Sequence, residues 1–144
     1  MTKNPSKNIR KTSPFILHFN SGGCNGCDIE IAASLSPKFN IEKYGNLLEA
    51  SPQNANILLT VGPVTLKQVK RLKETYNQMP EPKCVISVGS CTSTGGVFKG
   101  LYNVKDGLDN VIPVDVYIAG CPPRPDEIID GVKKAVEILK SKRK

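Results

Sequence analysis

The sequence has few aromatic residues, almost no histidine and no long apolar run. Its 144 residues include no Trp and one His, and aromatic residues make up 6% of the chain. The longest apolar run lies around residues 57–61, far shorter than the roughly 20 residues that a membrane-spanning helix needs. The first residues, MTKNPSKNIRK, are charged and have no apolar stretch behind them, so we expect no signal peptide. These absences predict an intracellular protein that is soluble or lies on a membrane surface.

Positive charge is concentrated at the two ends of the chain. The net charge is +7, yet residues 1–11 carry four bases and no acid, and residues 133–144 carry six bases and one acid. The segment between them holds ten bases and twelve acids, so the predicted domain itself is not basic. Nucleic-acid-binding faces combine clustered bases with aromatic residues, so we expect no nucleic acid partner. Basic ends are typical of soluble proteins, and contact with a membrane surface or an acidic partner is the alternative.

Apolar runs alternate with segments of helical periodicity along the chain. Buried strands are predicted at 14–20, 56–62, 84–89 and 114–120, and helices at 24–35, 65–79 and 125–140. Such alternation is typical of a parallel sheet that helices cover on both faces. The sequence therefore predicts an α/β fold, a flavodoxin-like three-layer sandwich with a parallel sheet.

One domain accounts for nearly the whole sequence. We expect residues 1–12 to form a basic N-terminal arm, 13–140 a single α/β domain, and 141–144 a basic C-terminal tail. The pattern within residues 97–112 favours neither helix nor strand.

Four of the five cysteines follow predicted strands. Cys24 and Cys27 follow the first strand, Cys91 the third and Cys121 the fourth. Because the carboxyl ends of parallel strands share one edge of a sheet, we expect these four side chains to meet there. A disulfide framework is not expected in a reducing compartment. Four thiolates at one point are instead typical of an iron–sulfur cluster or of zinc.

The spacing of the cysteines favours a [4Fe–4S] cluster at the carboxyl ends of the strands. Structural zinc sites typically use two cysteine pairs, whereas this chain has one C-x-x-C pair and two single cysteines. Cys121 is followed by Pro, as in bacterial ferredoxins, and the cysteine loops are rich in glycine. Zinc, or four thiols that hold no metal, remain the alternatives.

Three other residues carry separate hypotheses. Cys84 opens a predicted strand at the opposite end from the other cysteines, which predicts a buried, inert thiol. His18 lies within the first strand and is predicted to pack in the core. Glu30, three residues after Cys27, is either an acid that stabilises a helix N-terminus or a carboxylate that carries protons. With neither a nucleotide-binding loop nor a catalytic triad, the sequence predicts an electron relay to a reactive site on another chain.

The motifs SGGCNGCDIE, ASPQNANILLTVGPVT, YNQMPEPKCVISVGSCTSTGG and VIPVDVYIAGCPPRPDEI occur in this order between residues 14 and 140. Together they resemble the small electron-transfer subunit shared by complex I and membrane-bound [NiFe] hydrogenases. Complex I subunits carry two adjacent cysteines in the first motif, whereas Cys24, Cys27 and Glu30 resemble the hydrogenase pattern C-x-x-C-x-x-E. With no cysteine after Cys121, the chain is similar to energy-converting hydrogenases of the Ech, Mbh, Eha and Ehb types.

The resemblance implies a set of partners and a cofactor. Cys24, Cys27, Cys91 and Cys121 would hold the proximal [4Fe–4S] cluster, and Glu30 would lie on a proton route. A large subunit would hold the nickel–iron site, a polyferredoxin-like subunit would exchange electrons with ferredoxin, and membrane subunits would move H⁺ or Na⁺. The chain would then lie peripherally on the cytoplasmic side of the membrane.

Three alternatives remain open from the sequence. The first is a small subunit of complex I or of an F420H2 dehydrogenase, which reduces a quinone-type carrier such as methanophenazine. The second is a subunit of a membrane-bound sulfane reductase. The third is a zinc-stabilised interaction module without a redox function.

Overall fold

The structure is a computed structural model and describes residues 14–143. The predicted basic arm, residues 1–12, lies outside the described residues. The strands are β1 (Phe15–Asn20), β2 (Leu47–Leu48), β3 (Ile57–Val61), β4 (Val64–Thr65), β5 (Cys84–Val88), β6 (Val104–Lys105) and β7 (Val116–Ile118). The α-helices are α2 (Gly26–Ser34), α3 (Leu66–Gln78), α4 (Ser90–Thr94) and α5 (Pro125–Lys142), and short 3-10 helices are η1 (Ile41–Tyr44), η2 (Gly96–Phe98) and η3 (Leu108–Asn110).

Five parallel strands form the main sheet, in the order β2-β1-β3-β5-β7. Counted along the chain within this sheet, the order is 2-1-3-4-5, which is that of flavodoxin-like folds. The predicted α/β fold is therefore confirmed. Asn20, Val61, Val88 and Ile118 lie in register across the carboxyl edge of the sheet. The loops that follow these four strands consequently begin side by side.

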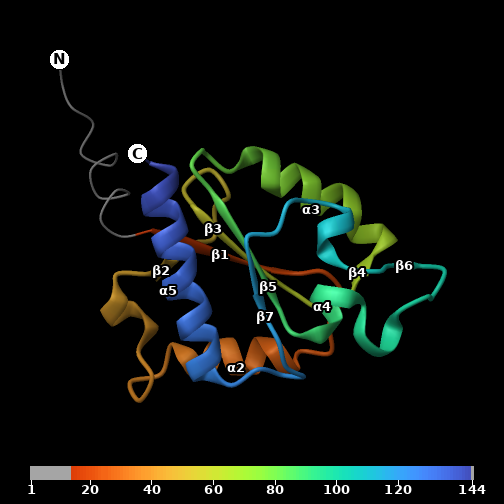
Figure 1. The fold of residues 1–144 in the computed structure, drawn as a ribbon, viewed down its shortest axis with the longest axis horizontal. Helices are drawn as coiled ribbons and strands as arrows, with labels where there is room; N and C mark the ends of the chain where they lie inside the picture. The colour runs from red at the N-terminus through yellow and green to blue at the C-terminus, as the bar shows by residue number, and fades with distance from the viewer. Residues whose placement is uncertain (1–13, 144) are drawn as a thin grey trace.

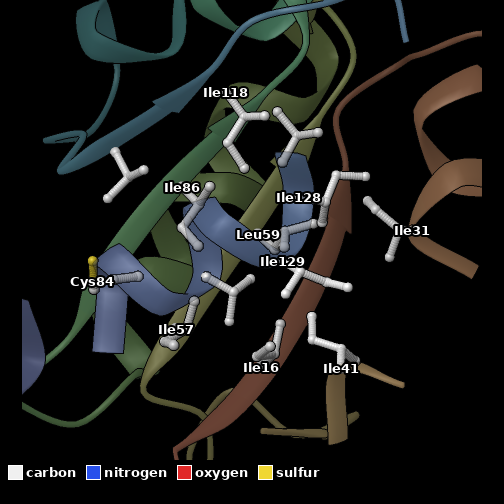
Figure 2. Close-up of a cluster of buried hydrophobic side chains, with 14 of the residues drawn as sticks. Ile16, Ile31, Ile41, Ile57, Leu59, Cys84, Ile86, Ile118, Ile128 and Ile129 are labelled. Carbon is white, nitrogen blue, oxygen red and sulfur yellow. The ribbon is translucent and has the colours of Figure 1, made fainter. Parts of the chain in front are cut away.

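Helices cover both faces of the sheet and create two apolar cores (Figure 1). On one face, Ile31 of α2 and Ile128 and Ile129 of α5 pack against Ile57, Leu59 and other strand residues (Figure 2). On the other face, Leu72 of α3 packs with Leu58 and Val85. Because residues from both faces of β3 and β5 are buried, these strands are continuously apolar in sequence. Each fully buried aliphatic side chain contributes about 1.5–3 kcal/mol to folding.

The structure differs from the sequence prediction in two segments. Helix α5 ends at Lys142, two residues inside the predicted tail, and the Lys142 ammonium donates to the Asp115 carboxylate at 2.6 Å. Because Asp115 lies outside the helix, the helical periodicity of α5 could not predict this contact. Residues 97–112, for which no structure was predicted, contain β6, which pairs with β4, and η3, whose Leu108 is buried.

Among residues 14–143, no helix combines the length and the apolar character that crossing a membrane requires.

Candidate functional site

A cavity of about 130 Å³ lies at the carboxyl edge of the sheet. Its lining includes Cys24 and Cys27 from the segment after β1, Cys91 from the start of α4 and Cys121 from the loop after β7. The structure therefore brings the four predicted cysteines around one cavity, although the first and the last lie 97 positions apart in the sequence. Cys24 and Cys121 are exposed, whereas Cys27 and Cys91 are partly covered.

Strand β3, which lies between β1 and β5, carries no cysteine and ends at the floor of this cavity. Val61 and Gly62 contribute to the lining. Gly62 has a φ of +81°, and a Cβ atom there would lie 2.3 Å from the backbone nitrogen of Gly23. A side chain at position 62 would therefore push away the loop that leads to Cys24. Because residue 62 has no side chain, the loop that leads to Cys24 can lie directly against the end of β3.

Gly89, directly after β5, leaves room for the Cys27 side chain in a similar way. Its φ is +85°, and a Cβ atom there would lie 2.8 Å from the Cys27 sulfur. Only glycine at the end of β5 allows this thiol to approach the backbone so closely.

Small hydroxyl side chains connect the loops around Gly62. Ser21 Oγ donates to the carbonyl oxygens of Val61 and Gly62 at 2.8 and 2.9 Å, and Thr92 Oγ1 donates to the same Gly62 carbonyl at 3.0 Å. The backbone N–H of Ser90 donates to the Gly120 carbonyl at 2.9 Å. Ser21 and Thr92 are fully buried, so these bonds hold the loops after β1, β3 and β5 in fixed relative positions. Sequence analysis missed both residues because isolated serines and threonines have no periodic pattern.

The pKa values of two lining thiols reflect their mutual proximity. Burial raises the pKa of Cys27 to about 11, and the neighbouring Cys91, Cys24 and Cys121 thiols raise it in the same direction. Burial, followed by Cys121 and Cys24, also raises the pKa of Cys91. Protonated thiols avoid mutual repulsion at neutral pH, and a cationic metal centre removes this repulsion by binding the thiolates.

The set of donor atoms around the cavity is suited to a metal group that prefers sulfur. Among the described residues, no three His, Cys, Asp or Glu side chains gather closely enough to hold a single metal ion. The four cysteines line the same cavity of about 130 Å³.

The other residues singled out in the sequence lie in different surroundings. Glu30 is half-buried on α2, outside the lining of the cavity as the described residues define it. Cys84 is completely buried at the start of β5, as predicted, and its sulfur lies at the border of the apolar core (Figure 2). The prediction for His18 is wrong: 32% of its side chain is exposed, and Nε2 lies 2.8 Å from Asp28 Oδ1. The reason is that α2 brings this carboxylate next to β1, a contact across a loop that the strand pattern does not contain.

Comparison with known proteins agrees with this geometry. The profile of the family described as NADH ubiquinone oxidoreductase, 20 Kd subunit, matches residues 24–135. The chain is 50% identical over 127 residues to the probable membrane-bound hydrogenase subunit mbhJ of Pyrococcus furiosus. The aligned residues cover 88% of this chain and 76% of that protein. It is 42% identical over 125 residues to an NADH-quinone oxidoreductase subunit of Anaeromyxobacter sp. (strain K), covering 87% of this chain and 72% of that protein.

A solved structure is also similar over almost the entire chain. A chain of the membrane-bound sulfane sulfur reductase, an archaeal respiratory membrane complex, is 38% identical with a TM-score of 0.79, covering 96% of this chain and 77% of that one. The resemblance found in the motifs is thus confirmed across the fold. The chain belongs to the NADH ubiquinone oxidoreductase 20 Kd subunit family and is an oxidoreductase subunit.

Proposed function

We propose that this chain is the small subunit of an energy-converting [NiFe] hydrogenase of the Ech, Mbh, Eha or Ehb type. In this proposal Cys24, Cys27, Cys91 and Cys121 hold a proximal [4Fe–4S] cluster. Electrons move through this chain between ferredoxin-linked clusters of a polyferredoxin-like partner and the nickel–iron site of a large subunit. Evolution or oxidation of H₂ is then coupled to movement of H⁺ or Na⁺ by membrane subunits.

The observation that carries the proposal is the shared cavity of the four cysteines. Their side chains line one cavity of about 130 Å³ at the carboxyl edge of the sheet. A cluster is favoured over the zinc alternative because structural zinc sites typically use two cysteine pairs, whereas this chain supplies one C-x-x-C pair and two single cysteines. When bound, a [4Fe–4S] cluster supplies a one-electron redox centre.

The chain's own residues account for holding such a group in place. Gly62 and Gly89 let the backbone lie close to the thiols, and Ser21 and Thr92 fix the loops that carry them. The sheet beneath the cavity keeps water away from the protein side, since Val61 and Val88 are fully buried. A rigid site of this kind limits reorganisation when the charge of a bound centre changes.

The hydrogenase branch is supported by the first cysteine motif. Cys24 and Cys27 are separated by two residues and followed by Glu30, as in the hydrogenase pattern. The identity to the mbhJ protein, 50%, is also higher than the 42% to the NADH-quinone oxidoreductase subunit. A complex I-type subunit that serves a quinone or methanophenazine reductase is therefore the weaker candidate.

A sulfane reductase subunit is the second candidate. It is favoured by the TM-score of 0.79 to a chain of the membrane-bound sulfane sulfur reductase. In either complex, we propose a peripheral position on the cytoplasmic side of the membrane, in contact with membrane subunits.

Replacement of one proposed ligand tests the cluster. Cys121→Ser should remove or convert the cluster and abolish electron flow in the purified complex, because one of four thiolates is lost. The measurement is iron and acid-labile sulfide content with EPR of the reduced protein. Cys84→Ala is the matched control and should keep the cluster, since Cys84 lies at the opposite end of the sheet. Full activity of Cys121→Ser, or zinc in place of iron and sulfide, would contradict the assignment.

Assays of the complete complex separate the branches. A hydrogenase should contain nickel in its large subunit and reduce viologen dyes with H₂, whereas a sulfane reductase should contain none and reduce polysulfide. Nickel analysis and these two activities on one preparation decide between them.

Glu30 is proposed as a proton-transfer residue toward the nickel site. Glu30→Gln keeps the shape of the side chain and removes its titratable group, so H₂ turnover should slow while the EPR signal of the cluster remains. Glu42→Gln, an exposed acid on η1, is the control. Turnover at the wild-type rate would exclude Glu30 from proton transfer; it lies beyond the first turn of α2, whose acid is Asp28.

A further inference from the structure

Asn20, the last residue of β1, connects both sides of the C-x-x-C loop. Its Oδ1 accepts hydrogen bonds from the backbone N–H groups of Gly22 and Gly23, at 2.9 and 2.8 Å. Its Nδ2 donates to Asp28 Oδ2 at 2.8 Å. Gly23 directly precedes Cys24, and Asp28 directly follows Cys27. One side-chain amide thus fixes the chain before the first cysteine and after the second.

His18 lies against the other carboxylate oxygen of Asp28. The two carboxylate oxygens of Asp28 have different partners: Oδ2 accepts from Asn20, and Oδ1 lies 2.8 Å from His18 Nε2. Only 22% of the Asp28 side chain is exposed, and Asp28 itself belongs to the lining of the cysteine cavity. A carboxylate is therefore held in one orientation beside the cysteine thiols.

We infer that Asn20 and Asp28 are positioning residues for the C-x-x-C loop, and that the Asp28 carboxylate lowers the reduction potential of the centre that this loop holds. The inference rests on the proposed cluster. A fixed negative charge beside a redox centre disfavours the reduced form, because reduction adds an electron and increases the local negative charge. The hydrogen bond from Asn20 and the contact with His18 Nε2 hold this carboxylate beside the cavity.

Removal of the charge without loss of shape tests the effect on the potential. Asp28→Asn keeps an oxygen that can accept from Asn20, so the full-length chain in its complex should retain its iron and sulfide. Its midpoint potential, from an EPR-monitored redox titration, should shift to a less negative value. Glu74→Gln removes one carboxylate from the exposed face of α3 and is the matched control. Equal potentials for Asp28→Asn, Glu74→Gln and the wild type would overturn this part of the inference.

An exchange of the two side chains tests the direct contact. Asn20→Asp keeps an acceptor for Gly22 and Gly23 but sets two carboxylates against each other, so iron and sulfide content should fall several-fold. Adding Asp28→Asn restores a donor and an acceptor across this contact, and cluster content should return toward the wild-type level. Normal loading of the single variant, or failure of the second change to restore loading, would overturn the positioning of the loop by Asn20.

A measurement that needs no cluster separates this inference from the proposed function. In the metal-free full-length chain, Asn20→Ala should increase hydrogen exchange at the Gly22 and Gly23 amides several-fold, because they lose their acceptor. Asn77→Ala, an exposed asparagine at the end of α3, should leave that exchange unchanged. If the wild type binds no cluster, the proposed function fails and the potential effect fails with it. Unchanged exchange in Asn20→Ala overturns the anchoring itself.

Discussion

At the carboxyl end of the sheet four cysteines line an open cavity, whereas at the amino end Cys84 is completely buried. The carboxyl-end cysteines lie on loops and on the first residues of helices, and two of them are exposed. Cys84 instead pairs with Ile57 within the sheet and contacts the apolar core. The same residue type is therefore a candidate metal ligand at one end of the strands and a core residue at the other.

The polar contacts at the two ends differ in the same way. At the amino end, the Asp115 carboxylate accepts from the Val85 N–H at 2.9 Å and from Lys142, which also donates to the Lys83 carbonyl. These bonds connect the last turn of α5 to β5. At the carboxyl end, hydrogen bonds run between neighbouring loops and surround a space. The amino-end contacts attach a helix to the sheet, whereas the carboxyl-end loops surround the cavity, which is where parallel α/β sheets typically bind ligands.

The largest effect is expected from a methyl group at the carboxyl end. Gly89→Ala would place Cβ 2.8 Å from the Cys27 sulfur at a φ of +85°. We expect a loss of about 1–3 kcal/mol of unfolding free energy from backbone strain, together with loss of bound iron and sulfide because Cys27 is displaced. Denaturant unfolding and iron analysis measure the two effects.

Gly100→Ala is the control for this substitution. Gly100 has a similar φ of +81°, but its Cβ would meet no atom within 4 Å. It should therefore show backbone strain alone, with normal iron content. Equal iron content in the two variants would mean that the contact between Gly89 and Cys27 does not matter for the site.

A change at the amino end should affect stability and leave the cluster intact. The buried Lys83 ammonium donates to the Tyr76 carbonyl at 2.8 Å and lies 3.9 Å from the centre of the Tyr76 ring. Lys83→Met keeps the aliphatic chain but removes these interactions, so we expect a loss of about 1–3 kcal/mol in unfolding free energy. The exposed Lys70→Met should change it by less than about 0.5 kcal/mol. A loss of cluster in Lys83→Met would show that the two ends are coupled.

The last prediction concerns the pH dependence of stability at the amino end, which is expected only above pH 9. Burial, followed by the Asp115 carboxylate, raises the pKa of Cys84 to about 12 from an ordinary value of 9.0. Because the folded pKa is the higher one, this stabilisation is complete below pH 9 and is lost as pH rises toward 12. The free energy of unfolding should fall by up to about 1.4 kcal/mol per pH unit in this interval. In Cys84→Ala the free energy of unfolding should lack this decrease above pH 9. Parallel pH profiles of stability for the variant and the wild type would contradict the prediction.

The cysteine arrangement could be predicted because the strands are so clearly apolar. Continuous runs such as that of β3 revealed buried parallel strands, and parallel strands necessarily share a carboxyl edge. Cys24, Cys91 and Cys121 follow such runs, so their convergence could be inferred without coordinates. The burial of Cys84 followed from the same reasoning, since it begins a strand.

The network around Asn20 could not be predicted in this way. Asn20, Asp28 and His18 are polar residues on two elements, and their contacts depend on the angle at which α2 leaves the sheet. The two-residue strand β2 was also missed, because its Leu47 and Leu48 are exposed and too few to form a pattern.

The amino-acid sequence alone was enough to establish the parallel α/β fold and the strand ends at which the cysteines lie, because a sheet buried on both faces requires long apolar runs. The volume of the cavity, the closeness of Gly89 to Cys27 and the orientation of Asp28 became visible only in the folded chain. Those features depend on contacts between loops from different strands, and such contacts follow no periodicity within any one segment.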